Sequence, residues 1–193
     1  EKPIYGVIDV MPPHALSSGD MSKALRIDDL YIDIGMSAEE AKAAVPVGTP
    51  CVYGAEAFRM GDESICGKSL DDRSCAAIII KTMEQLSKKG SGADVYCLFS
   101  VQEEVGLRGA RTASHGIRPD VALSVDTTAA SDTPEAMMDK TVCLGKGPGI
   151  KAMDASLLAS VPVRKFLQNV AKENNIPYQV EILVGIGTDA GEM

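Results

Sequence analysis

The sequence predicts an α/β protein, in which a mostly parallel sheet carries helices on both faces and a β-rich piece precedes it. Two observations support this fold class. After Cys66 the chain alternates between segments of helical periodicity and short apolar runs that are typical of buried strands. Before Cys66 it consists of short runs interrupted by Pro and Gly, which favour strands and turns.

The β-rich piece is expected to contain two strands and one short helix. The runs 4–8 and 30–34 are rich in apolar residues, and the second alternates with a period of two, as a half-buried strand does. Ser37 stands three residues before Glu40, which is the spacing of a helix-capping box. We therefore expect a short helix directly after Ser37.

Six segments alternate between helix and strand after Cys66. This order implies a largely parallel sheet with both faces covered. The stretch 145–150, GKGPGI, is expected to be a loop near the site rather than a phosphate cradle, because no helix start follows it. The predicted helices are 73–89, 107–114 and 161–175, and the predicted strands are 94–101, 121–125 and 179–184.

Composition argues against several function classes. The 193 residues carry a formal net charge of −8, which disfavours binding to the phosphate backbone of nucleic acids. The longest apolar run, 76–80, is far too short to span a bilayer and no signal-peptide pattern is present, so we expect a cytoplasmic protein that binds neither nucleic acid nor membranes. The five cysteines form no C-x-x-C pair, as is usual in a reducing compartment.

Acidic residues stand beyond the ends of the predicted strands. In open α/β sheets the loops beyond the carboxyl ends of the strands form the ligand crevice, so these residues are expected to converge there. Their mutual repulsion requires a counter-charge, which one or two divalent cations shared by the carboxylates would supply. The residues concerned are Asp71, Asp72, Glu103, Glu104, Asp126 and Asp189.

The adjacent residues Glu103 and Glu104 have a specific chemical interpretation. One carboxylate can bind a metal ion while the other acts as a general base for metal-activated water, although their spacing does not say which is which. His14 and His115 do not follow strand ends, so we expect structural or surface roles for them rather than metal binding. The predicted chemistry is hydrolysis at a dinuclear metal site.

Several stretches of the sequence resemble the catalytic-domain motifs of the tetrahedral, glutamyl-type metalloaminopeptidases, a family that includes proteins once labelled cellulase M or endoglucanase. The resemblance follows the order of the family motifs over essentially the whole chain, and upstream stretches resemble the inserted β-domain of that family. The catalytic-domain stretches are GKSLDDRSCAA, VQEEVGLRGARTA, RPDVALSVDTT, LGKGPGI, and ENNIPYQVE followed by GTDAG, and the upstream ones are KPIYGVIDVMPPH and RIDDLYIDIGMSAEEAK.

The resemblance implies a role for each acidic residue of the site. Asp71 would bridge two divalent metal ions, zinc or cobalt, and Glu104 and Asp126 would each hold one of them. Glu103 would be the general base, and Asp72 would support Asp71 from behind the metal ligands. The resemblance also implies a cis peptide bond between Asp71 and Asp72.

The resemblance further implies how the chain is organised. Residues 1–66 would be part of the inserted β-rich dimerisation domain, and residues 67–193 part of the zinc-aminopeptidase-like α/β catalytic domain. The loop of Gly187, Thr188 and Asp189 would line the substrate site. Family members assemble into dimers and tetrahedral dodecamers, and two histidine ligands are expected outside this chain. We therefore expect a middle segment of a longer polypeptide, inactive by itself.

The leading interpretation is an aminopeptidase that removes amino-terminal residues from peptides through metal-activated water. One alternative is a glycoside hydrolase with a pair of carboxylates, which would survive a strong chelator. A non-catalytic assembly module is a second alternative. A nucleotide-binding switch is a third, since Gly67-Lys68-Ser69 resembles the end of a phosphate loop, but Asp62 stands where that loop requires its first glycine.

Overall fold

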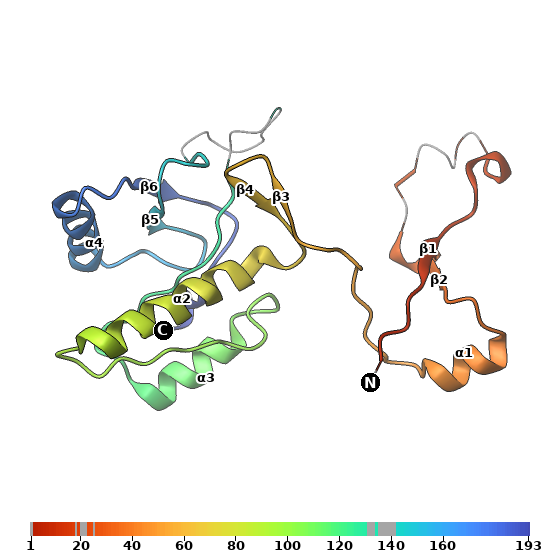
Figure 1. The fold of residues 1–193 in the computed structure, drawn as a ribbon, viewed down its shortest axis with the longest axis horizontal. Helices are drawn as coiled ribbons and strands as arrows, with labels where there is room; N and C mark the ends of the chain where they lie inside the picture. Colours follow the sequence, from red (N-terminus) through yellow and green to blue (C-terminus); the bar gives the residue numbers. More distant parts are fainter. Residues whose placement is uncertain (1, 18, 20–22, 25, 131–133, 135–141) are drawn as a thin grey trace. The chain divides into compact units, whose positions relative to one another are not determined.

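The computed structural model describes residues 2–17, 19, 23–24, 26–130, 134 and 142–193. The contacts within the chain divide it into two compact units, an N-terminal unit Glu1–Lys68 and a C-terminal unit Ser69–Met193 (Figure 1). In the described part of the chain, no helix combines the length and the apolar character that crossing a membrane requires.

The N-terminal unit contains two antiparallel strand pairs, β1 with β2 and β3 with β4, and one α-helix. The predicted strands 4–8 and 30–34 correspond to shorter strands that pair with each other. The predicted capping box is confirmed, because the Glu40 amide donates to Ser37 Oγ at 3.4 Å and the Ser37 amide donates to Glu40 Oε2 at 2.9 Å. The elements are β1 Val7–Asp9, η1 Pro13–Ala15, η2 Ile27–Asp29, β2 Tyr31–Asp33, α1 Ala38–Ala44, β3 Phe58–Met60 and β4 Ser64–Cys66.

The C-terminal unit contains the three predicted long helices and one parallel strand pair. Strands β5 and β6 are parallel neighbours, and α4 packs against β5, as Figure 1 shows. Helix α3 contacts the last turn of the chain, η3. The elements are α2 Leu70–Lys89, α3 Arg108–Ile117, β5 Gly149–Met153, α4 Val161–Glu173, β6 Gln179–Ile182 and η3 Asp189–Glu192.

Two predicted strands are corrected by the structure. Segments 94–101 and 121–125 are not strands, since neither pairs with another segment among the described residues. Their apolar side chains are largely exposed, as in Phe99 and Leu123, which are 53% and 55% exposed. An apolar run alone was therefore not enough to predict a strand, because a β-strand also needs a hydrogen-bonded neighbour.

Three strands were not expected from the sequence, namely β3 and β4 of the N-terminal unit and β5 of the C-terminal unit. Gly149 and Ile150, predicted to belong to a loop, instead begin β5, which pairs with β6 from Gly149 opposite Gln179 onward. Gly147, two residues before β5, has a φ of 89°, and a Cβ atom there would lie 2.0 Å from the Pro177 carbonyl oxygen. The glycine is therefore required for the close approach of this turn to the start of β6.

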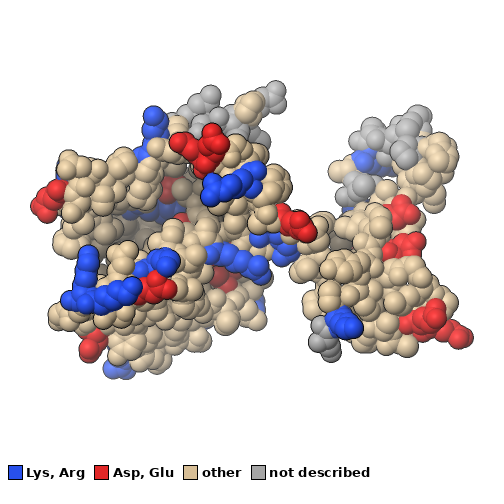
Figure 2. Space-filling view, viewed as in Figure 1, with Lys and Arg blue, Asp and Glu red and all other residues tan. Residues whose placement is uncertain are grey.

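Buried residues lie in the C-terminal unit, and several of them are polar. No described residue of the N-terminal unit is buried. Basic side chains are scattered over the drawn face of the C-terminal unit in Figure 2, and α2 carries Lys81, Lys88 and Lys89, whereas its first residues include two aspartates. The buried apolar residues are Cys75, Ala110, Val142, Ala152, Ala171 and Leu183, and the buried polar residues are Asp154, Glu181 and Thr188.

Candidate metal centre

Two of the predicted site carboxylates stand at the amino-terminal end of α2. Asp71 and Asp72 have non-helical backbone angles, so the regular helix starts after them. The peptide bond between them is cis, which confirms the prediction made from the family resemblance. The backbone of α2 orients Asp72, because its Oδ1 atom accepts a hydrogen bond of 3.1 Å from the Cys75 amide.

Three carboxylates come together at this end of α2. Asp71, Asp72 and Asp126 offer oxygen atoms that all lie within 4.8 Å of one another. Asp126 follows the extended segment 121–125, and its Oδ1 atom accepts a hydrogen bond of 2.8 Å from the Thr127 amide. Carboxylate oxygens are ligands for many divalent cations, and a bound cation would offset their repulsion. The group therefore fits a divalent cation.

Glu103 lies in a turn that leads into α3. Gln102 directly before it has a left-handed φ of 57°, a conformation that residues other than glycine rarely adopt and that turns the chain sharply. The amides of Gly106 and Leu107 donate hydrogen bonds of 3.0 and 2.9 Å to the Glu103 carbonyl. The backbone on both sides of Glu103 is thus held in a defined conformation.

The surroundings of Glu103 raise its pKa to about 7, with burial as the largest cause. Nearby negative charges add to this effect, in the order Asp126, Asp189, Glu104 and Asp71. Since such charges act appreciably only over short distances, carboxylates from separate segments of the chain lie around Glu103. Glu104 itself is exposed and is not one of the three carboxylates grouped at the end of α2.

The pKa values of Asp126 and Cys75 reflect the same accumulation of negative charge. Burial and the charges of Asp72 and Asp71 raise the pKa of Asp126, against the opposing effects of the Thr127 amide and the Lys151 charge. Burial, followed by the interaction with Asp72, raises the pKa of the Cys75 thiol to about 12. The thiol therefore stays protonated, and the chemistry of this site rests on its carboxylates.

The predicted substrate loop reaches the same region. Thr188 is buried and Gly187 is half-buried. Asp189 accepts a hydrogen bond of 2.5 Å from Ser100 Oγ through its Oδ2 atom, and its charge contributes to the raised pKa of Glu103. Its Oδ1 atom is buried and has no hydrogen-bond partner among the described residues.

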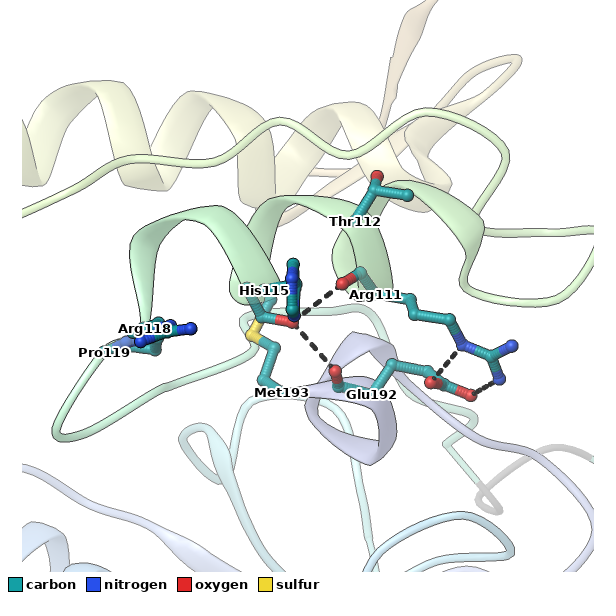
Figure 3. A pocket seen from close by; sticks show the side chains of 8 residues that line it. Arg111, Thr112, His115, Arg118, Pro119, Glu192 and Met193 are labelled. Atoms are coloured by element: carbon teal, nitrogen blue, oxygen red, sulfur yellow. Dashed lines mark hydrogen bonds and ion pairs between the residues drawn. The ribbon is translucent and has the colours of Figure 1, made fainter.

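The two histidines lie elsewhere. His115 is exposed on α3, where it lines an open pocket between this helix and the end of the chain (Figure 3). It is not part of the three-carboxylate group. His14 lies in η1 of the N-terminal unit.

A buried ion pair beside the site was missed from the sequence. Lys151 on β5 and Glu181 on β6 are register partners, with 3.6 Å between Nζ and Oε2. Thr128, two residues after Asp126, donates a hydrogen bond to the other carboxylate oxygen of Glu181. A charged residue inside an apolar strand is seldom buried unless an opposite charge pairs with it. The signal that could have predicted this pair was therefore the opposite charge of Lys151 in the stretch IKAM and of Glu181 in the stretch QVEI.

A sequence profile described as M42 glutamyl aminopeptidase matches residues 1–193. A putative aminopeptidase of Acetivibrio thermocellus is 44% identical over 172 residues, which cover 89% of this chain and 51% of that protein. The lysyl aminopeptidase of Pyrococcus furiosus is 36% identical over 193 residues, which cover 98% of this chain and 54% of that protein. The chain thus spans about half the length of the curated relatives it matches.

Solved structures give the same result for the fold. A TET aminopeptidase from a marine sediment archaeon of the Thaumarchaeota superposes with a TM-score of 0.89 at 36% identity, over 97% of this chain and 54% of that chain. A structure described as the PhTET1 dodecamer superposes with a TM-score of 0.78 at 30% identity, over 97% and 54% of the two chains. The predicted α/β class is confirmed, and these relatives give no support to a glycoside hydrolase.

Proposed function

The chain belongs to the M42 glutamyl aminopeptidase family, and from this membership we propose that the gene product carrying it removes amino-terminal residues from peptides with the help of bound divalent metal ions. The observation that carries the proposal is the meeting of Asp71, Asp72 and Asp126 within 4.8 Å. The negative charges of two of these three carboxylates, Asp126 and Asp71, help to raise the pKa of Glu103, which is half-buried.

Asp71, Glu104 and Asp126 are the residues that we propose would hold two divalent ions, zinc or cobalt. Asp72 is the proposed support for Asp71, and its bond from the Cys75 amide holds it in place. Bound ions of this kind lower the pKa of water and polarise a carbonyl group. The support from the structure for a divalent cation is the group of carboxylate oxygens and the negative charge that surrounds Asp126, and the proposal of zinc or cobalt rests on the family.

Glu103 is the proposed general base. A base works best when its pKa lies near the working pH, and the pKa of Glu103 is raised to about 7. The carboxylate would accept the proton that water loses when it attacks the peptide carbonyl and would then deliver a proton to the departing amine. The hydrogen bonds to the Glu103 carbonyl hold the backbone from which this side chain projects.

Peptides are the proposed substrates, with the loop of Gly187, Thr188 and Asp189 along their binding site. The support for this placement is the contact of Asp189 with Ser100 and its charge effect on Glu103. A substrate bound near this loop would lie next to the proposed base.

We also propose a homo-oligomer, from dimer to tetrahedral dodecamer, in which residues 1–66 form a dimerisation domain. Two relatives support this, since one solved structure is described as a dodecamer and another as assembling into a tetrahedron or an octahedral shell. The N-terminal unit exposes large apolar side chains, among them Tyr5 and Val7, which are 82% and 70% exposed. A cytoplasmic location fits the five free cysteines.

The test is amino-acid release from a short peptide by the gene product that carries this chain. We expect release from a peptide with a free amino terminus and none from its N-acetylated form. Activity should disappear after chelation and return with zinc or cobalt. Hydrolysis of a cello-oligosaccharide that persists in chelator, without any amino-acid release, would overturn the proposal.

A further inference from the structure

Ser156 fills the space between two glycines of the segment 186–192. A Cβ atom added at Gly187 would lie 2.7 Å from Ser156 Oγ, and one added at Gly191 would lie 2.5 Å from the same atom. The Thr188 amide between them donates to Ser156 Oγ at 3.4 Å. The segment therefore follows the surface of the Ser156 side chain closely, and only glycine permits the contact at both positions.

Asp154 holds Ser156 in this position. Its Oδ1 atom accepts hydrogen bonds from the Ser156 amide at 2.7 Å, from Ser156 Oγ at 2.9 Å and from the Leu157 amide at 2.7 Å. Asp154 is itself buried, with 5% of its surface exposed. The amide of Ala155, the residue after Asp154, donates a hydrogen bond of 2.9 Å to the Ile186 carbonyl of the segment. The turn 154–157 is thus a rigid support for segment 186–192.

Helix α3 holds the same segment at its other end. The Arg111 guanidinium donates through Nε and Nη2 to the two carboxylate oxygens of Glu192 at 2.6 and 2.5 Å, as Figure 3 shows. Ser114 Oγ donates to the Glu192 carbonyl at 3.0 Å. This two-point contact fixes both the distance and the angle between Glu192 and the helix.

Asp189 lies in the part of the segment that Ser156 contacts at Gly187 and Gly191 and that Arg111 holds at Glu192. We infer that Ser156 and Arg111 are positioning residues, which together hold segment 186–192 so that the Asp189 carboxylate stays beside Ser100 and the turn of Glu103. The inference rests on the proposed function, because it assigns these two residues to the alignment of the substrate loop with the proposed base. Neither residue touches the reacting atoms in this assignment.

A purely structural role makes a different prediction for Arg111. Its side chain is 69% exposed, and exposed ion pairs contribute little to stability. If the pair only added stability, its loss would leave the affinity for substrate unchanged. If it positions the loop, the loss should raise KM even where the melting temperature hardly moves.

The experiment compares Gly191→Ala with Gly116→Ala in the gene product that carries the chain. A Cβ atom at Gly191 would lie 2.6 Å from Ser156 Cβ, whereas one at Gly116 has no neighbour within 4 Å. We expect Gly191→Ala to raise KM for a peptide about tenfold, because small displacements of a binding loop are costly. Gly116→Ala should behave as wild type, and Ser156→Ala, which removes the Oγ atom that bonds to Asp154 and Thr188, should raise KM in the same direction as Gly191→Ala.

Arg111→Met is compared with Lys81→Met, which breaks an exposed ion pair with Glu84 on α2. Only Arg111→Met should raise KM, and the exchange Arg111→Glu with Glu192→Arg should recover part of the loss. Hydrogen exchange of the Gly191 amide, which donates to the Thr188 carbonyl at 2.9 Å, gives a readout that needs no activity. It should be about tenfold faster in Arg111→Met.

Each outcome decides the inference. Unchanged KM in both Gly191→Ala and Arg111→Met would overturn it, as would a wild-type KM in Ser156→Ala. Wild-type protein without amino-acid release would instead overturn the proposed function. In that case the Gly191 amide exchange still decides, since equal exchange in Arg111→Met and wild type would overturn the positioning role.

Discussion

The two units of the chain differ in where they place their charges. In the N-terminal unit, Arg26 and Asp28 form an ion pair of 3.0 Å between side chains that are 75% and 78% exposed. In the C-terminal unit, Lys151 and Glu181 form a longer pair of 3.6 Å, but their side chains are only 17% and 3% exposed. Water screens the attraction across the shorter, exposed contact, whereas loss of one partner of the longer pair would leave the other charge buried and uncompensated.

The same difference extends to the rest of each unit. No described residue of the N-terminal unit is buried, and its β3–β4 hairpin and helix follow from local turn and capping interactions. The C-terminal unit buries polar side chains and gathers carboxylates whose pKa values are raised. Burial, rather than the number of charges, therefore decides where a substitution should have a large effect.

The largest expected effect is that of Glu103→Gln on catalysis. If Glu103 is the general base, kcat should fall about a thousandfold, since proton transfer by a positioned base contributes factors of this order. The change keeps the size of the side chain and leaves Asp71 and Asp126 in place. The measurement is the steady-state release of an amino acid from a peptide.

The matched control for this substitution is Glu39→Gln, an exposed glutamate of α1 in the N-terminal unit. Its kcat should equal that of wild type. A Glu103→Gln variant that retains more than about a tenth of the wild-type kcat would remove Glu103 from the role of base.

The next effect is the cost of breaking the buried ion pair. Lys151→Met should destabilise the protein by about 3 kcal/mol, because it leaves Glu181 buried without its counter-charge. The measurement is the midpoint of urea unfolding. Arg26→Gln in the N-terminal unit should cost less than about 0.5 kcal/mol, and similar losses in the two variants would contradict the comparison.

A smaller effect is expected from pH in the metal-free protein. The folded state raises the pKa of Glu103 from its ordinary value of 4.5 to about 7, so it favours the protonated form. The stability from this group is fully present below about pH 4.5 and is lost as the pH rises through about 7. Glu103→Gln should melt close to wild type at pH 4 and above it at pH 8. A melting difference between the two proteins that does not change with pH would refute this assignment.

The smallest effect concerns a local interaction of the N-terminal unit. Ser37→Ala removes one half of the capping box of α1 and should cost about 1 kcal/mol of helix stability. Faster hydrogen exchange of the α1 amides, with unchanged exchange in α4, would show this directly. Unchanged exchange in α1 would mean that contacts other than the cap hold the helix.

Local signals explain which parts of the structure were predictable. Helices α1, α2, α3 and α4 carry their own periodicity and end signals, so their predicted ranges agree with the observed ones to within a few residues. The segments 94–101 and 121–125 were predicted from apolar character alone, which says nothing about a hydrogen-bonding neighbour. β5 was missed because the glycines and proline before it resembled a loop.

The site was predictable only in part for a similar reason. The position of the acidic residues after apolar runs indicated that they share one region, but the order of Glu103 and Glu104 came from the family resemblance. The partners that tune the site, Ser100 for Asp189 and Lys151 for Asp126, lie far from them in the sequence. No local pattern indicates such pairs, because they arise from the way the chain folds back.

Calorimetric titration of the metal-free gene product with cobalt tests most directly the claim that the carboxylates of the C-terminal unit bind metal. Wild type should bind two ions per chain, and Asp126→Asn should lose one of them or weaken by at least about tenfold. Asp28→Asn, which removes an exposed carboxylate of the N-terminal unit, should bind cobalt as wild type does. Equal affinity and stoichiometry in wild type and Asp126→Asn would contradict the account.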